Sequence, residues 1–330
     1  MSPTPDSGAA GLAEDTPLQA RRSAEARARR GDCNTTFQRV RCALNAFRLA
    51  YVLSTVALTI LILYPWLEVS VFLRFREGRR LISTLFCRIV RALLGLRIYV
   101  KGAAPSIRPL IVIANHTSWL DIIVISSLLP AIFVTKREVA GWPVFGRLAK
   151  LKPSIFVDRN RRLQVLKTIN CISTALTGGE AVAIFPEGTS TDGTVVLPFR
   201  SALFGAVRET LHKVEHLPAI FIQPVSIAYV GVNSRLVAWA REDEIEFLPH
   251  LLQVAALRRV DVALTWGEPI QADVNSDRKV LAKHLEETVR RMAAEAHRSD
   301  AHRADRPSLE AGKPVTPADG GRPLPASGER

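Results

Sequence analysis

The stretch from Leu49 to Leu67 constrains the fold of this chain more than any other, because nineteen consecutive residues carry no charge. It reads LAYVLSTVALTILILYPWL, and a helix of this length nearly matches the hydrocarbon thickness of a bilayer. The stretch begins far from Met1 and no small-residue cleavage site follows it, which argues against a cleavable signal peptide. We therefore predict that residues 46–100 form a membrane anchor that stays attached to the chain.

The residues around this stretch leave the geometry of the anchor open. Arginines flank both ends, so the positive-inside rule gives no clear orientation. The next segment, Leu81–Val100, places apolar residues at helical spacing with Arg88 and Arg91 between them, which predicts an interfacial amphipathic helix. A re-entrant or monotopic two-helix anchor with both ends in the cytosol is therefore a rival to a true span.

The two ends of the chain differ in composition from its middle. Residues 1–45 and 299–330 are rich in Ala, Pro, Gly and charge, which predicts a disordered basic arm and a disordered tail. The net charge of +13 suits nucleic acid or anionic lipid. Aromatic residues are not interleaved with Lys and Arg as on a single-strand binding platform, so we expect membrane lipids and no nucleic acid as partners.

Between the ends, residues 101–298 alternate between strand-like and helical patterns. We expect strands near 109–114, 131–135, 154–157, 180–185, 219–229 and 260–267. We expect helices near 118–129, 161–177, 201–213 and 277–297. This alternation predicts an α/β domain whose mostly parallel sheet is flanked by helices, preceded by the N-terminal membrane-anchoring helical segment.

A base and a carboxylate follow the first of these strands, in the stretch LIVIANHTSWLD from Leu110 to Asp121. Imidazole is the side chain whose ordinary pKa lies nearest neutrality, so His116 can act as a general base. A carboxylate improves such a base by fixing its tautomer and stabilising the imidazolium, and Asp121 comes round toward the histidine if a helix begins near Thr117 or Ser118. The spacing alone is weak evidence, because chance produces such pairs.

A second turn with polar residues lies in AIFPEGTS, from Ala183 to Ser190. An apolar strand ends at Phe185-Pro186 and opens a glycine-containing turn that holds Glu187, Thr189 and Ser190. Such a turn is common, and a Glu in it can simply cap the next element. Both turns, however, follow the carboxyl ends of predicted strands, the edge at which open α/β sheets bind ligands.

These two stretches resemble the signature motifs of one protein family. Asn115 to Asp121 resembles the NHX4D motif of the glycerolipid acyltransferase family, which contains 1-acylglycerol-3-phosphate acyltransferases, and Phe185 to Ser190 resembles its FPEGT motif. Two further blocks fall in the same order, SIFVDR ending at Arg159 and IQPVSI around Pro224. The stretch LPFRSALF departs from the family's PFKxGAF pattern by Arg for Lys and Ala for Gly. The resemblance covers roughly residues 100–270.

The resemblance implies a role for each matching residue. His116 would remove the proton of an acceptor hydroxyl, and Asp121 would hold the imidazolium while that oxygen attacks an acyl thioester. Glu187 and Gly188 would bind the acceptor, with Thr189 nearby. Arg159 would bind the anionic headgroup of the acceptor, with Lys136 and Arg137 as lesser candidates.

The expected reaction carries an acyl chain to the free hydroxyl of a lysophospholipid. Its acceptor is 1-acyl-sn-glycerol-3-phosphate, which becomes phosphatidic acid; the alternative is a lyso-ornithine lipid, because HTSWLD and TSTDG are similar to variants of that branch. A third reading is a non-catalytic lipid-binding or nucleic-acid-binding membrane protein. The donor would be acyl-CoA or acyl-acyl carrier protein, and no other cofactor and no metal is expected. We expect the protein in the bacterial inner membrane, with the catalytic domain on the cytoplasmic side.

Overall fold

The computed structural model describes residues 17–136, 154–157, 162–213, 219–231, 233–239 and 246–304. Side chains are described over slightly narrower ranges, from Ala43 onward. The chain divides into two compact units, Met1–Tyr51 and Val52–Arg330. The second unit contains the sheet, its covering helices and every residue discussed below as part of a site.

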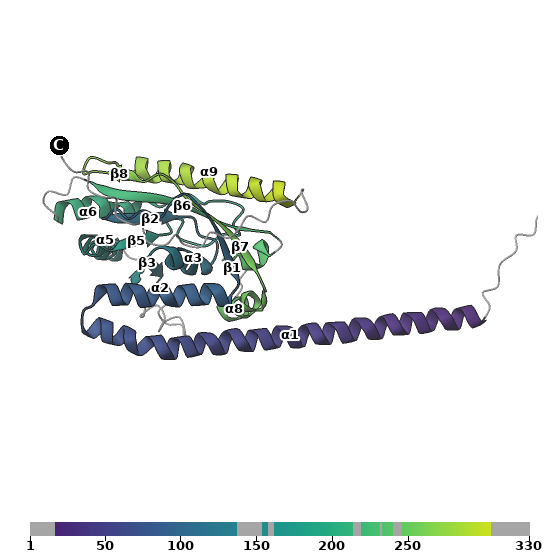
Figure 1. Ribbon diagram of the computed structural model, residues 1–330. Helices are drawn as coiled ribbons and strands as arrows, with labels where there is room; N and C mark the ends of the chain where they lie inside the picture. The colour runs from purple at the N-terminus through teal and green to yellow at the C-terminus, as the bar shows by residue number, and fades with distance from the viewer. Residues whose placement is uncertain are drawn as a thin grey trace, which may run out of the picture. The chain divides into compact units, whose positions relative to one another are not determined.

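The second unit is built on one mixed sheet with the strand order β1-β7-β6-β2-β5-β3-β4 (Figure 1). Its pairs are parallel except for β6 with β7 and β6 with β8, which are antiparallel. The strands are β1 (Leu96–Lys101), β2 (Leu110–Ala114), β3 (Ala131–Lys136), β4 (Ser154–Val157), β5 (Ala181–Ile184), β6 (Ile220–Val230), β7 (Val260–Trp266) and β8 (Ile270–Ala272).

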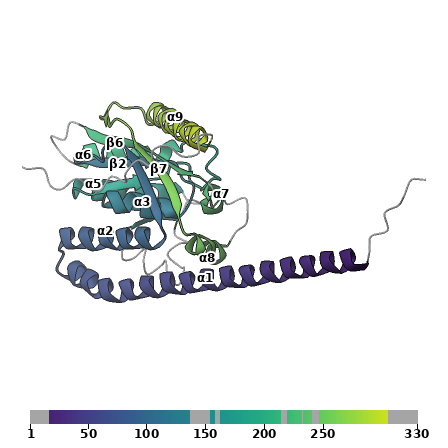
Figure 2. The same ribbon diagram turned by 45° about the vertical axis from the view of Figure 1, so that its right-hand side comes forward.

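Helices cover both faces of this sheet, and α9 lies on the opposite side from α2 in both views (Figures 1 and 2). Central strand β2 is buried throughout, as expected for a parallel strand covered on both faces. Its residues Ile111 and Ile113 join a core with α5, α6 and α9. The helical elements are α1 (Pro17–Phe72), α2 (Arg76–Leu93), α3 (Leu120–Leu128), α5 (Arg162–Thr177), η2 (Ser201–Phe204), α6 (Gly205–Lys213), α7 (Ser234–Val237), α8 (Phe247–Ala256) and α9 (Arg278–Ala304).

The α/β prediction is confirmed, including the mostly parallel sheet flanked by helices. All six predicted strands are present as β2 to β7, and the four predicted helical regions are present as α3, α5, η2 with α6, and α9. The turns after β2 and β5 lie side by side, because these two strands pair in parallel. The domain boundaries placed at residues 45, 100 and 298 stay predictions.

The prediction of one amphipathic helix over Leu81–Val100 is wrong after Leu93. Helix α2 ends at Leu93, and Leu96–Lys101 forms edge strand β1 along β7. Gly95 makes this change of direction: its φ of 68° is the left-handed conformation, and a Cβ there would lie 2.5 Å from the Arg258 carbonyl oxygen.

Helix α1 is longer than the uncharged stretch that predicted it. It begins at Pro17, so part of the arm expected to be disordered is helical. Its segment Ala43–Phe72 is long and apolar enough to cross a membrane, with a mean hydropathy of 2.0, which is consistent with the predicted anchor. The tail beyond Ala304 lies outside the described residues.

Candidate active site

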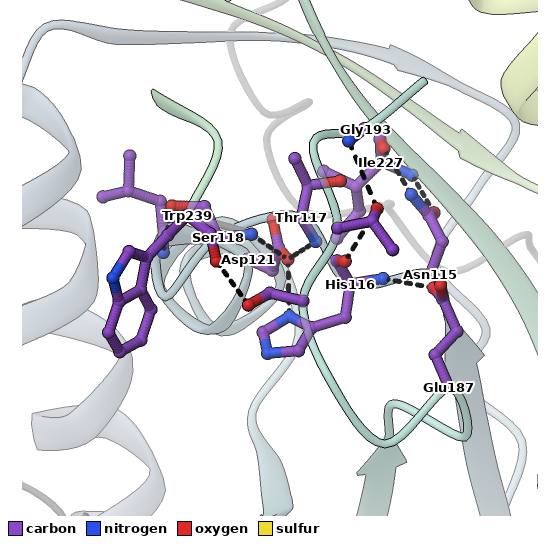
Figure 3. Close-up of polar contacts among 12 residues, drawn as sticks. Asn115, His116, Thr117, Ser118, Asp121, Glu187, Gly193, Ile227 and Trp239 are labelled. Carbon is purple, nitrogen blue, oxygen red and sulfur yellow. Dashed lines mark hydrogen bonds and ion pairs between the residues drawn. The ribbon is translucent and has the colours of Figure 1, made fainter. Parts of the chain in front are cut away.

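The turn after β2 is fixed to strand β6 by the side chain of Asn115. The Asn115 amide donates to the Ile227 carbonyl at 2.8 Å, and the Ile227 N–H donates back to the Asn115 amide oxygen at 2.8 Å. Because Asn115 is buried, this two-way contact satisfies groups that would otherwise be costly to bury. It sets the direction in which the chain leaves the sheet just before His116 (Figure 3).

His116 and Asp121, the predicted catalytic pair, are brought together by this turn. The Nδ1 atom of His116 lies 2.8 Å from Oδ2 of Asp121, and the side chain of His116 is 20% exposed while that of Asp121 is fully buried. The same Oδ2 accepts the backbone N–H groups of Thr117 and Ser118 at 2.8 and 2.9 Å. An ionised Asp121 can only accept, so Nδ1 carries the hydrogen and the lone pair of Nε2 is left for a substrate (Figure 3).

Tyr229, on β6, completes the surroundings of Asp121 and was not predicted from the sequence. Its hydroxyl donates to Oδ1 of Asp121 at 2.7 Å, and its side chain is buried. Burial and, secondarily, the negative charge of Asp121 raise the pKa of Tyr229 well above its ordinary value, so the phenol keeps its proton. The alternation of strand 219–229 was visible in the sequence, but nothing there linked Tyr229 to a residue 108 positions earlier.

Glu187 lies beneath the same turn, and both of its oxygens accept backbone groups. Oε1 accepts the His116 N–H at 2.7 Å and Oε2 accepts the Leu197 N–H at 2.8 Å. Glu187 is only 3% exposed, and burial raises its pKa to about 7 even though the two N–H donors act in the opposite direction. The structure thus places this carboxylate where it positions His116; the predicted contact with an acceptor hydroxyl stays a prediction.

The residues that follow Glu187 hold the turn after β2 from the other side. Gly188 has a φ of 80°, a conformation that favours glycine, and its N–H donates to the Phe185 carbonyl at 3.2 Å. Thr189 is half-buried beside it. The Thr191 N–H donates to the His116 carbonyl at 2.9 Å, so the backbone of the base is held at both its N–H and its carbonyl.

An apolar cavity of about 360 Å³ lies next to the turn that holds His116 and Asp121. The Phe185 ring stacks on His116 with centroids 4.3 Å apart, and it lies 6.0 Å from the ring of Phe133, which lines the cavity. Trp119 lines the cavity as well. The remaining wall comes from α1 between residues 52 and 67, from α2, α3 and α8, and from Thr135 and Ser154.

Helix α8, which was not predicted from the sequence, contacts the turn after β2 through His250. The Trp119 indole N–H donates to Nδ1 of His250 at 3.0 Å, and Nε2 of His250 lies 3.1 Å from the Ala238 carbonyl oxygen. Burial lowers the pKa of His250, which is consistent with a neutral ring that accepts at one nitrogen and donates at the other. The Trp239 N–H adds a bond to the Thr117 carbonyl at 2.9 Å.

The residues predicted to bind an anionic headgroup are not placed by the structure. Arg159 and Arg137 lie outside the described residues. Lys136 ends strand β3, but its side chain is outside the described part of the chain. Their roles stay predictions.

Comparison with known proteins identifies the relatives of this chain. A family model described as Acyltransferase matches residues 96–228. The chain is 37% identical over 234 residues to a lyso-ornithine lipid O-acyltransferase of Brucella abortus, covering 68% of this chain and 86% of that protein. It is 32% identical over 299 residues to a lyso-ornithine lipid O-acyltransferase of Rhizobium meliloti, covering 88% and 97%.

More distant similarities extend to proteins with another named acceptor. A 1-acyl-sn-glycerol-3-phosphate acyltransferase of Neisseria gonorrhoeae is 26% identical over 185 residues, covering 56% of this chain and 69% of that protein. The crystal structure of a 1-acyl-sn-glycerophosphate acyltransferase from Thermotoga maritima matches 78% of this chain and 97% of its own, with a TM-score of 0.58 and 23% identity. At that identity the likeness concerns the fold.

Proposed function

The chain belongs to the glycerolipid acyltransferase family and is an acyltransferase of lysolipids, and from this premise we propose that it acylates the free hydroxyl of a lyso-ornithine lipid. The acceptor rests on two relatives named for it, which match 68% and 88% of this chain. The chemistry rests on one observation of the site, the 2.8 Å contact between Nδ1 of His116 and Asp121. A catalytic His116 and Asp121 are part of this proposal.

In the proposed reaction, His116 first accepts one proton and then gives one proton back. Nε2 of His116 takes the proton from the acceptor hydroxyl as its oxygen attacks the carbonyl carbon of the acyl thioester. Asp121 stabilises the imidazolium that forms. The tetrahedral intermediate collapses with cleavage of the C–S bond, and the imidazolium returns its proton to the departing thiolate. The acceptor supplies the nucleophile, so no acyl-enzyme is needed.

The acyl chain of the donor would occupy the apolar cavity. Phe133 of its wall lies 6.0 Å from the ring of Phe185, which stacks on His116, so a chain in the cavity would bring its thioester close to His116. Burying apolar chain surface there contributes roughly 0.8 kcal/mol per methylene. The donor would be acyl-acyl carrier protein or acyl-CoA, and we expect the reaction to need no metal and no further cofactor.

The choice of acceptor reverses the order that the sequence suggested. Arg159 and the frequency of this acceptor in the family put 1-acyl-sn-glycerol-3-phosphate first, and the motif variants HTSWLD and TSTDG put lyso-ornithine lipid second. The relatives named for the lyso-ornithine lipid are 37% and 32% identical over 234 and 299 residues, whereas the relative from Neisseria gonorrhoeae named for the phosphate acceptor is 26% identical over 185 residues. Lysophosphatidic acid is therefore the second candidate. We further propose the inner membrane as the site of action, with the catalytic domain facing the cytoplasm, where acyl thioesters are made.

The decisive experiment offers both acceptors to the same protein. Membranes containing the full chain are incubated with a labelled acyl thioester, as carrier-protein or coenzyme A conjugate, and either lyso-ornithine lipid or lysophosphatidic acid. We expect the lyso-ornithine lipid to give the higher kcat/KM. His116→Ala is the control and should abolish transfer to either acceptor.

Each alternative predicts a different result. Preference for lysophosphatidic acid would refute the proposed acceptor and leave the acyltransferase chemistry in place. Unchanged transfer by His116→Ala would refute the mechanism. An Arg159→Ala variant tests the predicted headgroup contact, because it should raise the KM for the acceptor and leave the KM for the thioester unchanged.

A further inference from the structure

The Asp121 carboxylate is surrounded by four hydrogen-bond donors that fall into two unequal groups. Oδ2 accepts from His116 and from two backbone N–H groups, whereas Oδ1 accepts from the hydroxyl of Tyr229 at 2.7 Å. Among the described residues, Tyr229 is the one donor recorded for Oδ1. Without it, only the contacts of Oδ2 would hold the carboxylate, and Oδ1 would lose its donor among the described residues.

Tyr229 reaches this position through the same strand that fixes the turn before His116. Ile227 exchanges two hydrogen bonds with Asn115, and Tyr229 follows two residues later, on the same face of β6. Strand β6 pairs in parallel with β2, the strand that delivers His116. The position of the carboxylate and that of the base are therefore set by one pair of strands.

We propose that Tyr229 is a positioning residue of acyl transfer: its hydroxyl holds the Asp121 carboxylate in the plane in which Oδ2 meets Nδ1 of His116. The inference rests on the proposed catalytic role of these two residues. A phenylalanine would fill the same buried space, so a tyrosine that served only packing would not need its hydroxyl. A hydrogen bond from a buried hydroxyl to an ionised carboxylate is also stronger than a hydrogen bond between two neutral groups.

Loss of the hydroxyl should act on the pH profile as well as on the rate. The titratable groups of the described residues that surround Asp121 are His116 after β2, Glu187 after β5 and Tyr229 on β6. With one donor fewer, the negative charge of Asp121 is less well satisfied by the protein. It should then hold a protonated His116 more tightly, so the acidic limb of the kcat/KM profile should move to higher pH.

The test compares Tyr229→Phe with Tyr99→Phe in the full chain, assayed with whichever lysolipid the wild type acylates. Tyr99, on edge strand β1, is the matched control because its hydroxyl also contacts an aspartate, Asp261, at 3.4 Å, while its side chain lies two strands away from Tyr229 on the opposite face of the sheet. For Tyr229→Phe we expect kcat to fall about tenfold, the size expected when one hydrogen bond to a charged group is lost. We expect both KM values to stay within about twofold and the acidic limb to move to higher pH. Tyr99→Phe should match the wild type.

The proposal is overturned if Tyr229→Phe keeps its kcat, or if its activity falls only in proportion to the folded fraction with no displacement of the acidic limb. A second measurement does not depend on turnover. In protein labelled with ¹⁵N-histidine, the Nδ1–H signal of His116 should shift or broaden in Tyr229→Phe and stay in place in Tyr99→Phe; an unchanged signal in both also overturns the proposal. A wild type that acylates no lysolipid would refute the proposed function, while this signal still decides the role of Tyr229.

Discussion

Asp121 holds a charge in the interior of the second unit, fully buried and bonded to His116 and to two backbone N–H groups of its own turn. Asp121→Asn keeps the shape of the side chain and removes the charge that stabilises the imidazolium. We expect kcat to fall by about 10²- to 10⁴-fold, the usual contribution of general acid–base catalysis, with little change in KM. Steady-state assays of acyl transfer measure this.

The control for this variant is Asp192→Asn. Asp192 is exposed and accepts hydrogen bonds only locally, from the N–H and hydroxyl of Thr194 at 2.9 and 2.7 Å. Its variant should retain wild-type activity. If Asp121→Asn retained wild-type kcat, Asp121 could not be the partner of the base.

Glu187 should make the stability of the protein depend on pH. Its pKa of about 7 in the folded protein lies above the ordinary value of 4.5, so the native state binds more protons than the unfolded state between these values. The free energy of unfolding should therefore fall as the pH rises through this window, by about 3 kcal/mol over its full width. The contribution is complete below pH 4.5 and lost above pH 7.

The measurement is denaturant unfolding at several pH values between 5 and 8, for the wild type and for Glu187→Gln. The amide cannot ionise, so the curve of the variant should lack this component. Its –NH₂ group also cannot accept, so either His116 or Leu197 loses an acceptor, and the variant should be less stable than the wild type at pH 5. Parallel pH dependence of the two proteins would contradict the assignment.

The site residues that the sequence revealed are those close together along the chain. His116 and Asp121 are five positions apart, and a strand followed by a helix was enough to bring them together. Glu187 was found as a candidate, but its contact with the His116 N–H depends on the pairing of β2 with β5. Tyr229 and His250 could not be found, because their partners come from distant segments and neither belongs to a motif.

Helix α9, which contains none of the family motifs, supports the site through hydrogen bonds to the loop between Gly193 and Phe199. Oε2 of Glu286 accepts the Phe199 N–H at 2.9 Å, and Arg290 contacts the Val196 carbonyl at 3.1 Å. Nε2 of His297 lies 3.0 Å from the Gly193 carbonyl oxygen. This loop also supplies the Leu197 N–H that Glu187 accepts. Helix α9 is therefore linked to Glu187 through the loop.

Glu286→Ala should therefore destabilise the protein, whereas the same change at its exposed neighbour Glu287 should not. Leaving the Phe199 N–H without its acceptor should cost about 1–3 kcal/mol, against less than about 0.5 kcal/mol at the control position. Thermal unfolding measures the stability, and hydrogen exchange should show faster exchange of the 195–199 amides in Glu286→Ala. Equal stability of the two variants would contradict the role given to α9.

The elements that the sequence predicted are those with a strong period or a long apolar run. The continuous run of β2 and the alternation of β7 gave correct strands. Strand β1 was missed because its apolar residues continue the helical spacing of α2, and only the left-handed Gly95 separates the two. Helix α8 was missed because Pro249 and the short apolar run around it do not distinguish a helix from a loop.

At the scale of the whole molecule, the second half of α1 has two different surroundings. Residues between 52 and 67 line the cavity together with α2, α3 and α8, so one side of this segment faces the interior of the second unit. The other side and the turn that follows expose large apolar residues: Leu61, Ile62, Trp66, Phe72 and Leu73 are each more than half exposed. This arrangement favours a monotopic anchor over a helix that is surrounded by lipid. Deletion of the whole segment would not test anchoring alone, because it would also remove part of the cavity wall.

Substitution of the exposed residues tests the anchor and leaves the cavity wall intact. The variant Leu61→Glu/Trp66→Glu/Phe72→Glu removes three side chains that are 71%, 65% and 86% exposed. Each would contribute roughly 1.5–3 kcal/mol if it is buried in lipid, so their joint loss should move most of the protein from the membrane pellet to the supernatant.

The matched control places three glutamates at exposed apolar positions elsewhere in the second unit, Leu166, Val274 and Val280, which are 61%, 50% and 69% exposed. The control should sediment like the wild type, because those positions lie outside the predicted anchor, residues 46–100. Release of both variants would point to a general effect of charge, and retention of the first variant in the pellet would show that this face does not hold the protein at the membrane.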